Sequence, residues 1–205
     1  MRETASMTTY SARERTALAD ALDAAGPDAA TLCEGWSTRD LAAHLVLRER
    51  RPDAAAGMVL EAVPALKGHT DRLMRQTAQR AYPELVDQFR TGPQRASLLA
   101  LPGADARVNL AEHFIHHEDV RRAAPGWAAR VLSPGHEAAL WGACRLMARR
   151  SFLRSAVGVV LVVPDGPRAT VRRGSSTMVL TGLASELLLY VAGRQDQAEV
   201  LVAAP

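Results

Sequence analysis

The hydrophobic period of this chain changes once, and that change constrains the fold more than any other feature. In segments such as residues 10–25, apolar residues recur at helical spacing. Residues 156–163 instead read AVGVVLVV, an apolar and β-branched run of strand length. We therefore expect an α+β chain, with a helical domain over residues 1–152 and a small α+β domain over residues 153–205.

Local signals place individual elements within this plan. Ser37 is followed three residues later by Asp40, a spacing typical of a helix N-terminus. Glycine and proline residues end several of the other segments. The expected helices cover residues 10–25, 37–50, 69–80, 83–92, 105–123, 133–150 and 185–194. The expected strands cover residues 156–163, 168–173, 177–181 and 199–202.

The composition excludes several classes of protein. The net charge is only +3, and the arginines are scattered among acids, unlike the basic stripe of a nucleic-acid binder. No apolar run approaches the roughly 18 residues of a membrane span, and the first residues lack the apolar core of a signal peptide. Cys33 and Cys144 show no paired spacing, so we expect two unbonded thiols in a cytoplasmic protein. Packing is the expected role of Cys33, because free cysteines are commonly buried.

Three of the 6 histidines fall within residues 109–120, beside three carboxylates. On a helix, Glu112 and His116 lie one turn apart, and so do His113 and His117, about 100° further round. Either pair could chelate one metal ion, and spacing alone does not choose between them. The alternative interpretation is a solvated helix face with no metal.

His44 is the candidate for a further ligand. It lies among apolar residues on a predicted helix, which predicts that its side chain is buried. A buried imidazole needs a partner, either a backbone carbonyl or a metal ion. Because helical bundles project ligands inward from facing helices, His44 could join the cluster near residue 116. We interpret His69 and His136 as surface or capping residues.

Two segments carry a resemblance to a known family. Residues 35–45 read GWSTRDLAAHL and match the pattern G-W-[ST]-x-[RK]-[DE]-[LV]-x-A-H-[LI]. Residues 112–119 match the pattern E-x-x-x-H-H-x-D on a later helix. In this order, the two segments resemble the DinB-like superfamily, and within it the mycothiol-dependent maleylpyruvate isomerase branch. The resemblance implies a DinB-like four-helix bundle followed by a small α+β C-terminal domain.

The resemblance also implies a site. It assigns a divalent metal, with zinc as the first choice, to His44, Glu112 and His116, and it leaves Asp119 to orient a ligand from behind. Gly193-Arg194 resembles the end of the C-terminal helix where the isomerase branch has an active-site arginine, which makes Arg194 the catalytic candidate.

The implied function is a thiol-dependent transferase or isomerase, with mycothiol as the thiol. The partners would be this thiol and a small electrophilic substrate, with neither nucleic acid nor membrane, and a homodimer is allowed. The alternative is a non-catalytic metal- or ligand-binding protein, acting as a sensor or accessory module.

Overall fold

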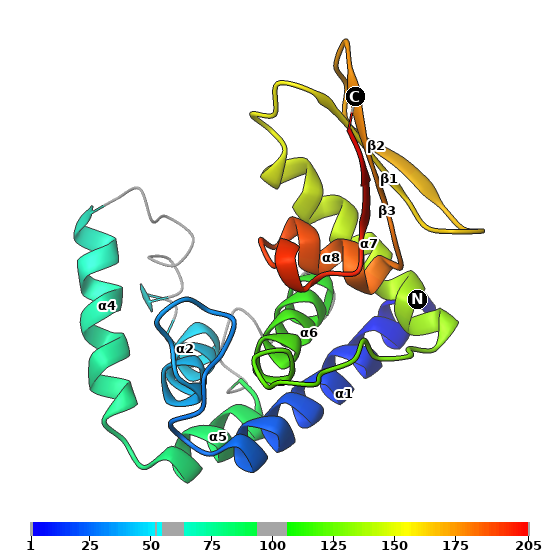
Figure 1. The fold of residues 1–205 in the computed structure, drawn as a ribbon. Helices are drawn as coiled ribbons and strands as arrows, with labels where there is room; N and C mark the ends of the chain where they lie inside the picture. The colour runs from blue at the N-terminus through cyan, green and yellow to red at the C-terminus, as the bar shows by residue number, and fades with distance from the viewer. Residues whose placement is uncertain (1, 52, 55–63, 94–105, 205) are drawn as a thin grey trace. The chain divides into compact units, whose positions relative to one another are not determined.

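The computed structural model describes residues 2–51, 53–54, 64–93 and 106–204. Within these residues it contains seven α-helices and one sheet of four strands (Figure 1). The chain divides into two compact units. The helical unit comprises Ala12–Ala106 and His116–Trp127, and the sheet unit comprises Met1–Ser11, Arg107–Ile115 and Ala128–Pro205. Helices α1 (Arg2–Ala25) and α6 (Ala106–Arg121) each contribute residues to both units.

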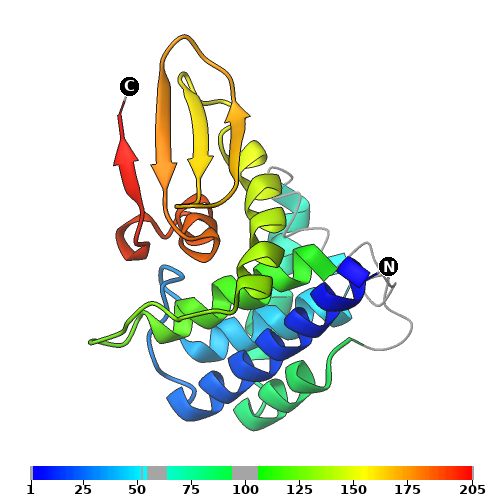
Figure 2. The same cartoon turned by 90° about the vertical axis from the view of Figure 1, so that its right-hand side faces the viewer.

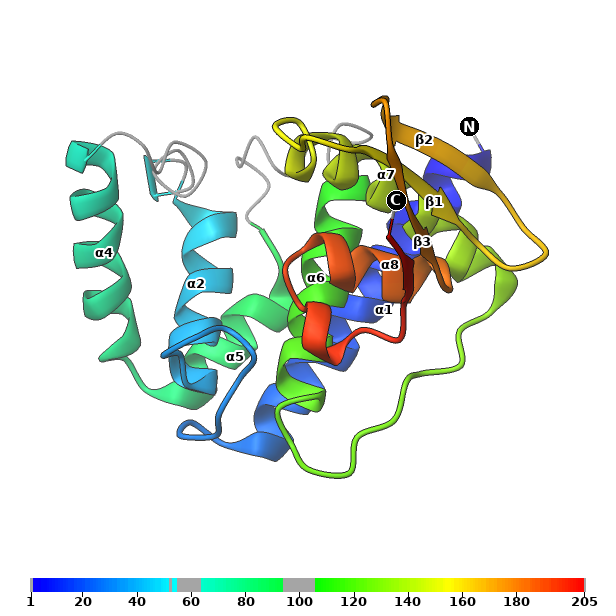
Figure 3. The same cartoon turned by 45° about the horizontal axis from the view of Figure 1, so that its top comes forward.

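The helical unit is completed by α2 (Thr38–Arg50), α4 (Pro64–Ala78) and α5 (Tyr82–Thr91). Helix α2 contacts both α4 and α5, and α2 and α4 run side by side (Figure 3). The apolar faces of these helices meet α1 and the end of α6 in one core. Its largest fully buried side chains are Leu18, Leu22, Leu41, Leu45, Leu85 and Phe89.

The sheet unit contains α7 (Pro134–Ser151), the strands β1 (Gly158–Val162), β2 (Arg168–Arg172), β3 (Thr177–Thr181) and β4 (Leu201–Ala203), and α8 (Ala184–Val191). The strand order is β2-β1-β3-β4 (Figure 2). Strands β1 and β3 are parallel, whereas β2 and β4 pair antiparallel at the two edges. A short 3-10 helix, η2 (Gln195–Gln197), lies between α8 and β4.

Burial follows the sequence pattern in this unit. The continuous apolar run of β1 is buried at four of its five positions, whereas edge strand β2 alternates between exposed and half-buried residues. Helix α8, which is apolar on nearly all sides, packs against α7. One core cluster joins residues of α6, α7, β1, β3 and α8, so the sheet needs these helices to cover its apolar residues.

The expected α+β organisation, helical first and mixed later, is confirmed. Helix α1 begins at residue 2 rather than 10, and β4 begins two residues later than expected. The boundary between residues 152 and 153 stays a prediction about independent folding. Among the described residues, none of the helices is long and apolar enough to cross a membrane.

Candidate metal centre

Helix α2 starts at a reciprocal cap that Ser37 and Asp40 form. The Asp40 backbone N–H donates to Ser37 Oγ, and the Ser37 backbone N–H donates to Asp40 Oδ2 over 3.0 Å. Two backbone donors that a helix start leaves open are satisfied in this way. The expected start of the helix is therefore confirmed, and it fixes the direction in which α2 presents His44.

The loop before this cap is tied to α6. The Leu32 backbone N–H donates to the Asp119 carbonyl over 3.1 Å. Thr31 Oγ1 accepts from the Cys33 N–H at 3.2 Å and donates to the Trp36 carbonyl at 3.0 Å. Gly35 has φ +74°, the left-handed region that favours glycine. These bonds hold the loop in a tight turn that carries Cys33 and Trp36 toward side chains of α2 and α6.

His44 and His116 face each other within the helical unit. Their ring centroids lie 5.3 Å apart, and the two ring planes make an angle of 69°. His44 also contacts Trp36, with 5.2 Å between the ring centroids. One ligand nitrogen of each histidine lies within 4.8 Å of the other. His44 is half-buried rather than buried as expected, because it faces His116 while its neighbours Leu41 and Leu45 enter the core.

Glu112 precedes His116 by one turn of α6. Helical spacing therefore places it beside His116, and a carboxylate oxygen of Glu112 lies within 4.8 Å of a His116 ring nitrogen. His44, Glu112 and His116 thus form a group of side chains that could hold a metal ion. Two imidazoles and one carboxylate fit a divalent cation such as zinc and leave at least one position open.

The other histidine pair on α6 makes different contacts. His113 Nδ1 lies 3.1 Å from the Ser11 carbonyl and 3.3 Å from the Ser11 hydroxyl. His117 Nδ1 lies 3.1 Å from Glu14 Oε2, and both of those side chains are buried. His113 and His117, the pair that spacing offered as the alternative metal ligands, are therefore each engaged at Nδ1 by a residue of α1.

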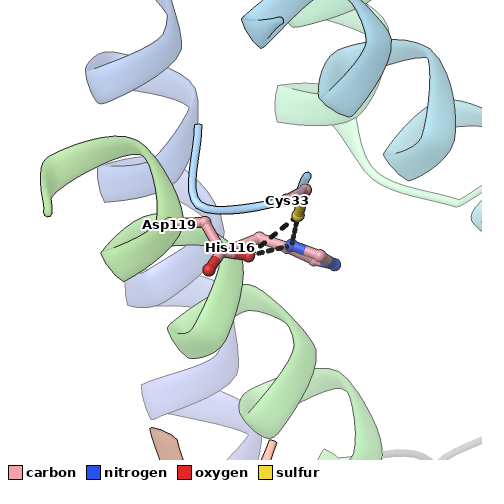
Figure 4. A group of neighbouring side chains, drawn as sticks. All are labelled: Cys33, His116 and Asp119. Carbon is pink, nitrogen blue, oxygen red and sulfur yellow. Dashed lines mark hydrogen bonds and ion pairs between the residues drawn. The ribbon is translucent and has the colours of Figure 1, made fainter. Parts of the chain in front are cut away.

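Behind His116 lies a carboxylate–thiol pair that connects α6 to the loop (Figure 4). His116 Nδ1 is 2.8 Å from Asp119 Oδ2, and the Cys33 thiol donates to the same oxygen at 3.2 Å. Asp119 has no exposed surface. If His116 carries its proton on Nδ1, the hydrogen bond to Asp119 fixes the ring and leaves Nε2 as the ligating atom. Sequence spacing gave no sign that Cys33 reaches this pair, because the path of the loop is set by packing.

Charged groups next to this cluster are buried and paired. Glu118 accepts from Arg122 Nε at 2.6 Å and from Arg121 at 2.9 Å, with Glu118 and Arg122 almost fully buried. The Arg122 guanidinium also lies 4.5 Å from the Trp127 ring centroid. This network anchors the last turn of α6, which carries Asp119.

Arg194 and the remaining histidines lie outside this group. Arg194 follows α8 in the sheet unit, is half-buried, and donates to the Ala192 carbonyl over 2.6 Å. His69 is partly exposed and pairs with Asp53 at 2.9 Å, as expected of a surface residue. Of the two alternatives for His136, the surface position is wrong, because its ring is buried and stacks on Tyr10 at 4.7 Å, whereas its backbone N–H does donate to the N-cap Ser133. The contact with Tyr10 joins residues too far apart in sequence for local signals to show it.

The two cysteines differ in environment. Both are free thiols, which confirms the expectation that they are not bonded to each other. Cys33 is half-buried in the loop, whereas Cys144 is buried in α7. Burial raises the pKa of the Cys144 thiol to about 12, so this thiol stays protonated and unreactive near neutral pH.

Comparison with known proteins shows which solved structures share this fold. No family model and no curated protein sequence matches the chain. Among solved structures, the α+β arrangement matches that of a mycothiol-using enzyme. The mycothiol-dependent maleylpyruvate isomerase matches with a TM-score of 0.65 at 14% identity, over 98% of this chain and 92% of that one. A variant of that isomerase with one histidine replaced by alanine gives a TM-score of 0.66 at the same identity and coverage. The chain therefore has the fold of this isomerase, and at such low identity the likeness extends to the fold alone.

Proposed function

We propose that this protein is a metal-dependent enzyme that uses a low-molecular-weight thiol, with mycothiol as the first choice. It acts as a transferase or an isomerase on a small electrophilic substrate. The observation that carries the proposal is the meeting of His44 and His116, with Glu112 one turn before His116. These residues lie in a fold that a mycothiol-dependent isomerase shares.

The proposed site assigns each of its residues a role. His44, Glu112 and His116 would hold one divalent ion, with zinc first because two imidazoles and a carboxylate suit it. A bound divalent cation favours the deprotonated form of an entering thiol, and the thiolate is the nucleophile for addition at an electrophilic carbon. Asp119 holds the His116 ring in one orientation through the 2.8 Å hydrogen bond.

Arg194 is the proposed residue for recognising a substrate carboxylate. A guanidinium is planar and always charged, and it can bind a carboxylate through two parallel N–H donors. Arg194 follows the end of α8 directly after Gly193, which has φ +90°. This assignment is separate from the metal site and has its own test. The test measures whether Arg194→Lys changes KM only for substrates that carry a carboxylate.

The proposal is tested by thiol-dependent turnover of the purified protein against a panel of electrophiles that includes maleylpyruvate, with mycothiol as the thiol. Glu112→Gln and His44→Ala should each lower turnover by at least about 100-fold, because each removes a direct ligand. His69→Ala is the matched control, since this histidine lies at the surface beside Asp53 and should keep turnover unchanged. Full turnover in Glu112→Gln and His44→Ala would contradict the proposal.

A non-catalytic metal- or ligand-binding protein is the second candidate. The observation that favours it concerns the acid–base groups next to the site. His113 and His117 are engaged by Ser11 and Glu14, so neither is presented as a general base for a substrate. This candidate predicts stoichiometric metal together with no thiol consumption across the electrophile panel. The same assay therefore separates the two functions.

A further inference from the structure

We propose that Cys33, Asp119 and Nδ1 of His116 form a second metal-binding position in the helical unit, one that takes a thiophilic divalent cation such as Zn²⁺ or Cd²⁺. One ligand atom of each residue lies within 4.8 Å of the other two. A thiolate, an imidazole and a carboxylate are all zinc ligands, and the thiolate favours soft cations. This position does not depend on the catalytic proposal.

The donor atoms already approach the geometry of a tetrahedral ion. Standard zinc–ligand distances place sulfur about 3.6 Å from nitrogen, sulfur about 3.5 Å from oxygen, and nitrogen about 3.3 Å from oxygen. The observed separations are 3.9 Å for Cys33 Sγ to His116 Nδ1, 3.2 Å for Sγ to Asp119 Oδ2, and 2.8 Å for Nδ1 to Oδ2. Each differs from the expected separation by less than about 0.6 Å, a change that small side-chain rotations can supply.

The backbone holds the three donors in place before any ion binds. His116 and Asp119 lie one turn apart on α6, where the helix fixes their spacing. Cys33 lies in the loop before α2. This loop is held by two hydrogen bonds, from the Leu32 N–H to the Asp119 carbonyl and from Thr31 Oγ1 to the Trp36 carbonyl. Cys33 is half-buried whereas Asp119 is fully buried, so we expect an ion to enter from the Cys33 side. The thiolate and the carboxylate together would balance the charge of a divalent cation.

The shared histidine makes the two metal positions alternatives. A neutral imidazole has one nitrogen with a free lone pair and one that carries hydrogen. Nδ1 faces Cys33 and Asp119, and the second ring nitrogen points away from them (Figure 4). Ligation through Nδ1 therefore requires the proton on Nε2, which removes Nε2 from the position shared with His44. Binding at Cys33 also releases the thiol proton to solvent, so charge and protons balance.

Two consequences follow for metal binding by the whole chain. His116 can serve one ion at a time, so we expect one metal per chain rather than two. The choice between positions should follow the cation, because thiolate attracts Cd²⁺ whereas Mn²⁺ prefers nitrogen and oxygen ligands. Cd²⁺ should therefore select Cys33 and Asp119, and Mn²⁺ should select His44 and Glu112.

The test is titration of the metal-free full-length protein with Cd²⁺, followed by the near-ultraviolet absorbance of cadmium–thiolate bonds. The wild type and His44→Ala should both develop this absorbance up to one equivalent of Cd²⁺. Cys33→Ser, a near-isosteric change, should lack it and should bind Cd²⁺ at least about tenfold more weakly, with Mn²⁺ affinity unchanged. Cd²⁺ should also protect Cys33 from alkylation, and buried Cys144 should contribute no background.

No thiolate absorbance in the wild type at saturating Cd²⁺, or the same absorbance in Cys33→Ser, would overturn this second position and leave only a hydrogen-bonded triad. The absorbance in His44→Ala separates this result from the catalytic proposal. If it is present while turnover is absent in every thiol assay, the second position stands and the catalytic proposal fails. If turnover follows Glu112 and His44 without any thiolate absorbance, the reverse holds.

Discussion

The two compact units both have an apolar core, but among the described residues they differ in the charged side chains that they bury. The helical unit buries Glu14, Glu49, Glu118, Asp119 and Arg122, of which Asp119 contacts His116 of the candidate metal centre. The sheet unit packs a continuous apolar cluster across α6, α7, β1, β3 and α8, and among its described acids only Glu186 is buried. Buried charge contributes little net stability, and removing one partner is costly. The comparison therefore indicates that the sheet unit relies mainly on apolar packing, whereas the helical unit also keeps costly charged groups in its interior, one of them against a proposed metal ligand.

The largest expected effect tests this contrast in the helical unit. Glu118→Ala removes the carboxylate that Arg122 Nε contacts at 2.6 Å, and the Arg122 side chain is only 1% exposed. The free energy of unfolding should fall by about 3–5 kcal/mol, because a buried guanidinium loses its counter-charge. Denaturant unfolding measures it, with Glu118→Gln as the control that keeps an oxygen acceptor and loses less. A loss below about 1 kcal/mol would show that the buried charges do not matter to the fold.

The next effect belongs to the sheet unit. Leu187→Ala should lower the free energy of unfolding by about 2–5 kcal/mol, because this fully buried side chain of α8 leaves a cavity in the apolar cluster. Metal content should not change, since Leu187 is not one of the proposed ligands. Leu146→Ala on α7 is the matched control, because Leu146 is 57% exposed and should cost less than about 0.5 kcal/mol. Equal losses in the two variants would argue against a packed core there.

The third effect is a loss of stability at alkaline pH that arises from Cys144 in the sheet unit. Burial raises the pKa of Cys144 from 9.0 to about 12, so the unfolded chain loses this proton first. The stabilising contribution is therefore complete below pH 9 and is lost as pH rises toward about 12, at up to about 1.4 kcal/mol per pH unit. Unfolding of the wild type and Cys144→Ala at several pH values measures this slope. An identical pH dependence in the two proteins would mean that Cys144 is accessible in the folded state.

The smallest effect compares two helix caps. Ser37→Ala removes the cap of α2 and should lower the free energy of unfolding by about 1 kcal/mol. Ser133 caps α7 through the His136 N–H, and Ser133→Ala should cost a similar amount. The two variants should differ in metal affinity, because only α2 carries His44. If Ser133→Ala weakens metal binding as much as Ser37→Ala, the cap of α2 has no special role in the site.

Local sequence signals were enough for most elements. The cap at Ser37 and the strand over residues 177–181 appear where they were expected, because turn chemistry and β-branched runs act over a few residues. The first eight residues of α1 were missed, since they carry neither a clear cap nor a regular apolar stripe. The burial of the His136 ring could not be predicted, because its stacking on Tyr10 depends on tertiary packing.

Only part of the site could be predicted from the sequence. Helical spacing gave two registers on α6, and it could not choose between Glu112/His116 and His113/His117. The contacts of His113 with Ser11 and of His117 with Glu14 cross about a hundred positions of sequence, so no local pattern encodes them. The approach of Cys33 to Asp119 has the same origin in the path of a loop.

The central claim is that His44, Glu112 and His116 hold one divalent ion. The direct measurement is metal content after zinc loading and desalting, carried out in the Cys33→Ser background so that the second position is removed. Cys33→Ser and Cys33→Ser/His69→Ala should retain about one zinc per chain, as three protein ligands suffice. Cys33→Ser/His44→Ala and Cys33→Ser/Glu112→Ala should lose it. One full equivalent of zinc in all four proteins would contradict the assignment.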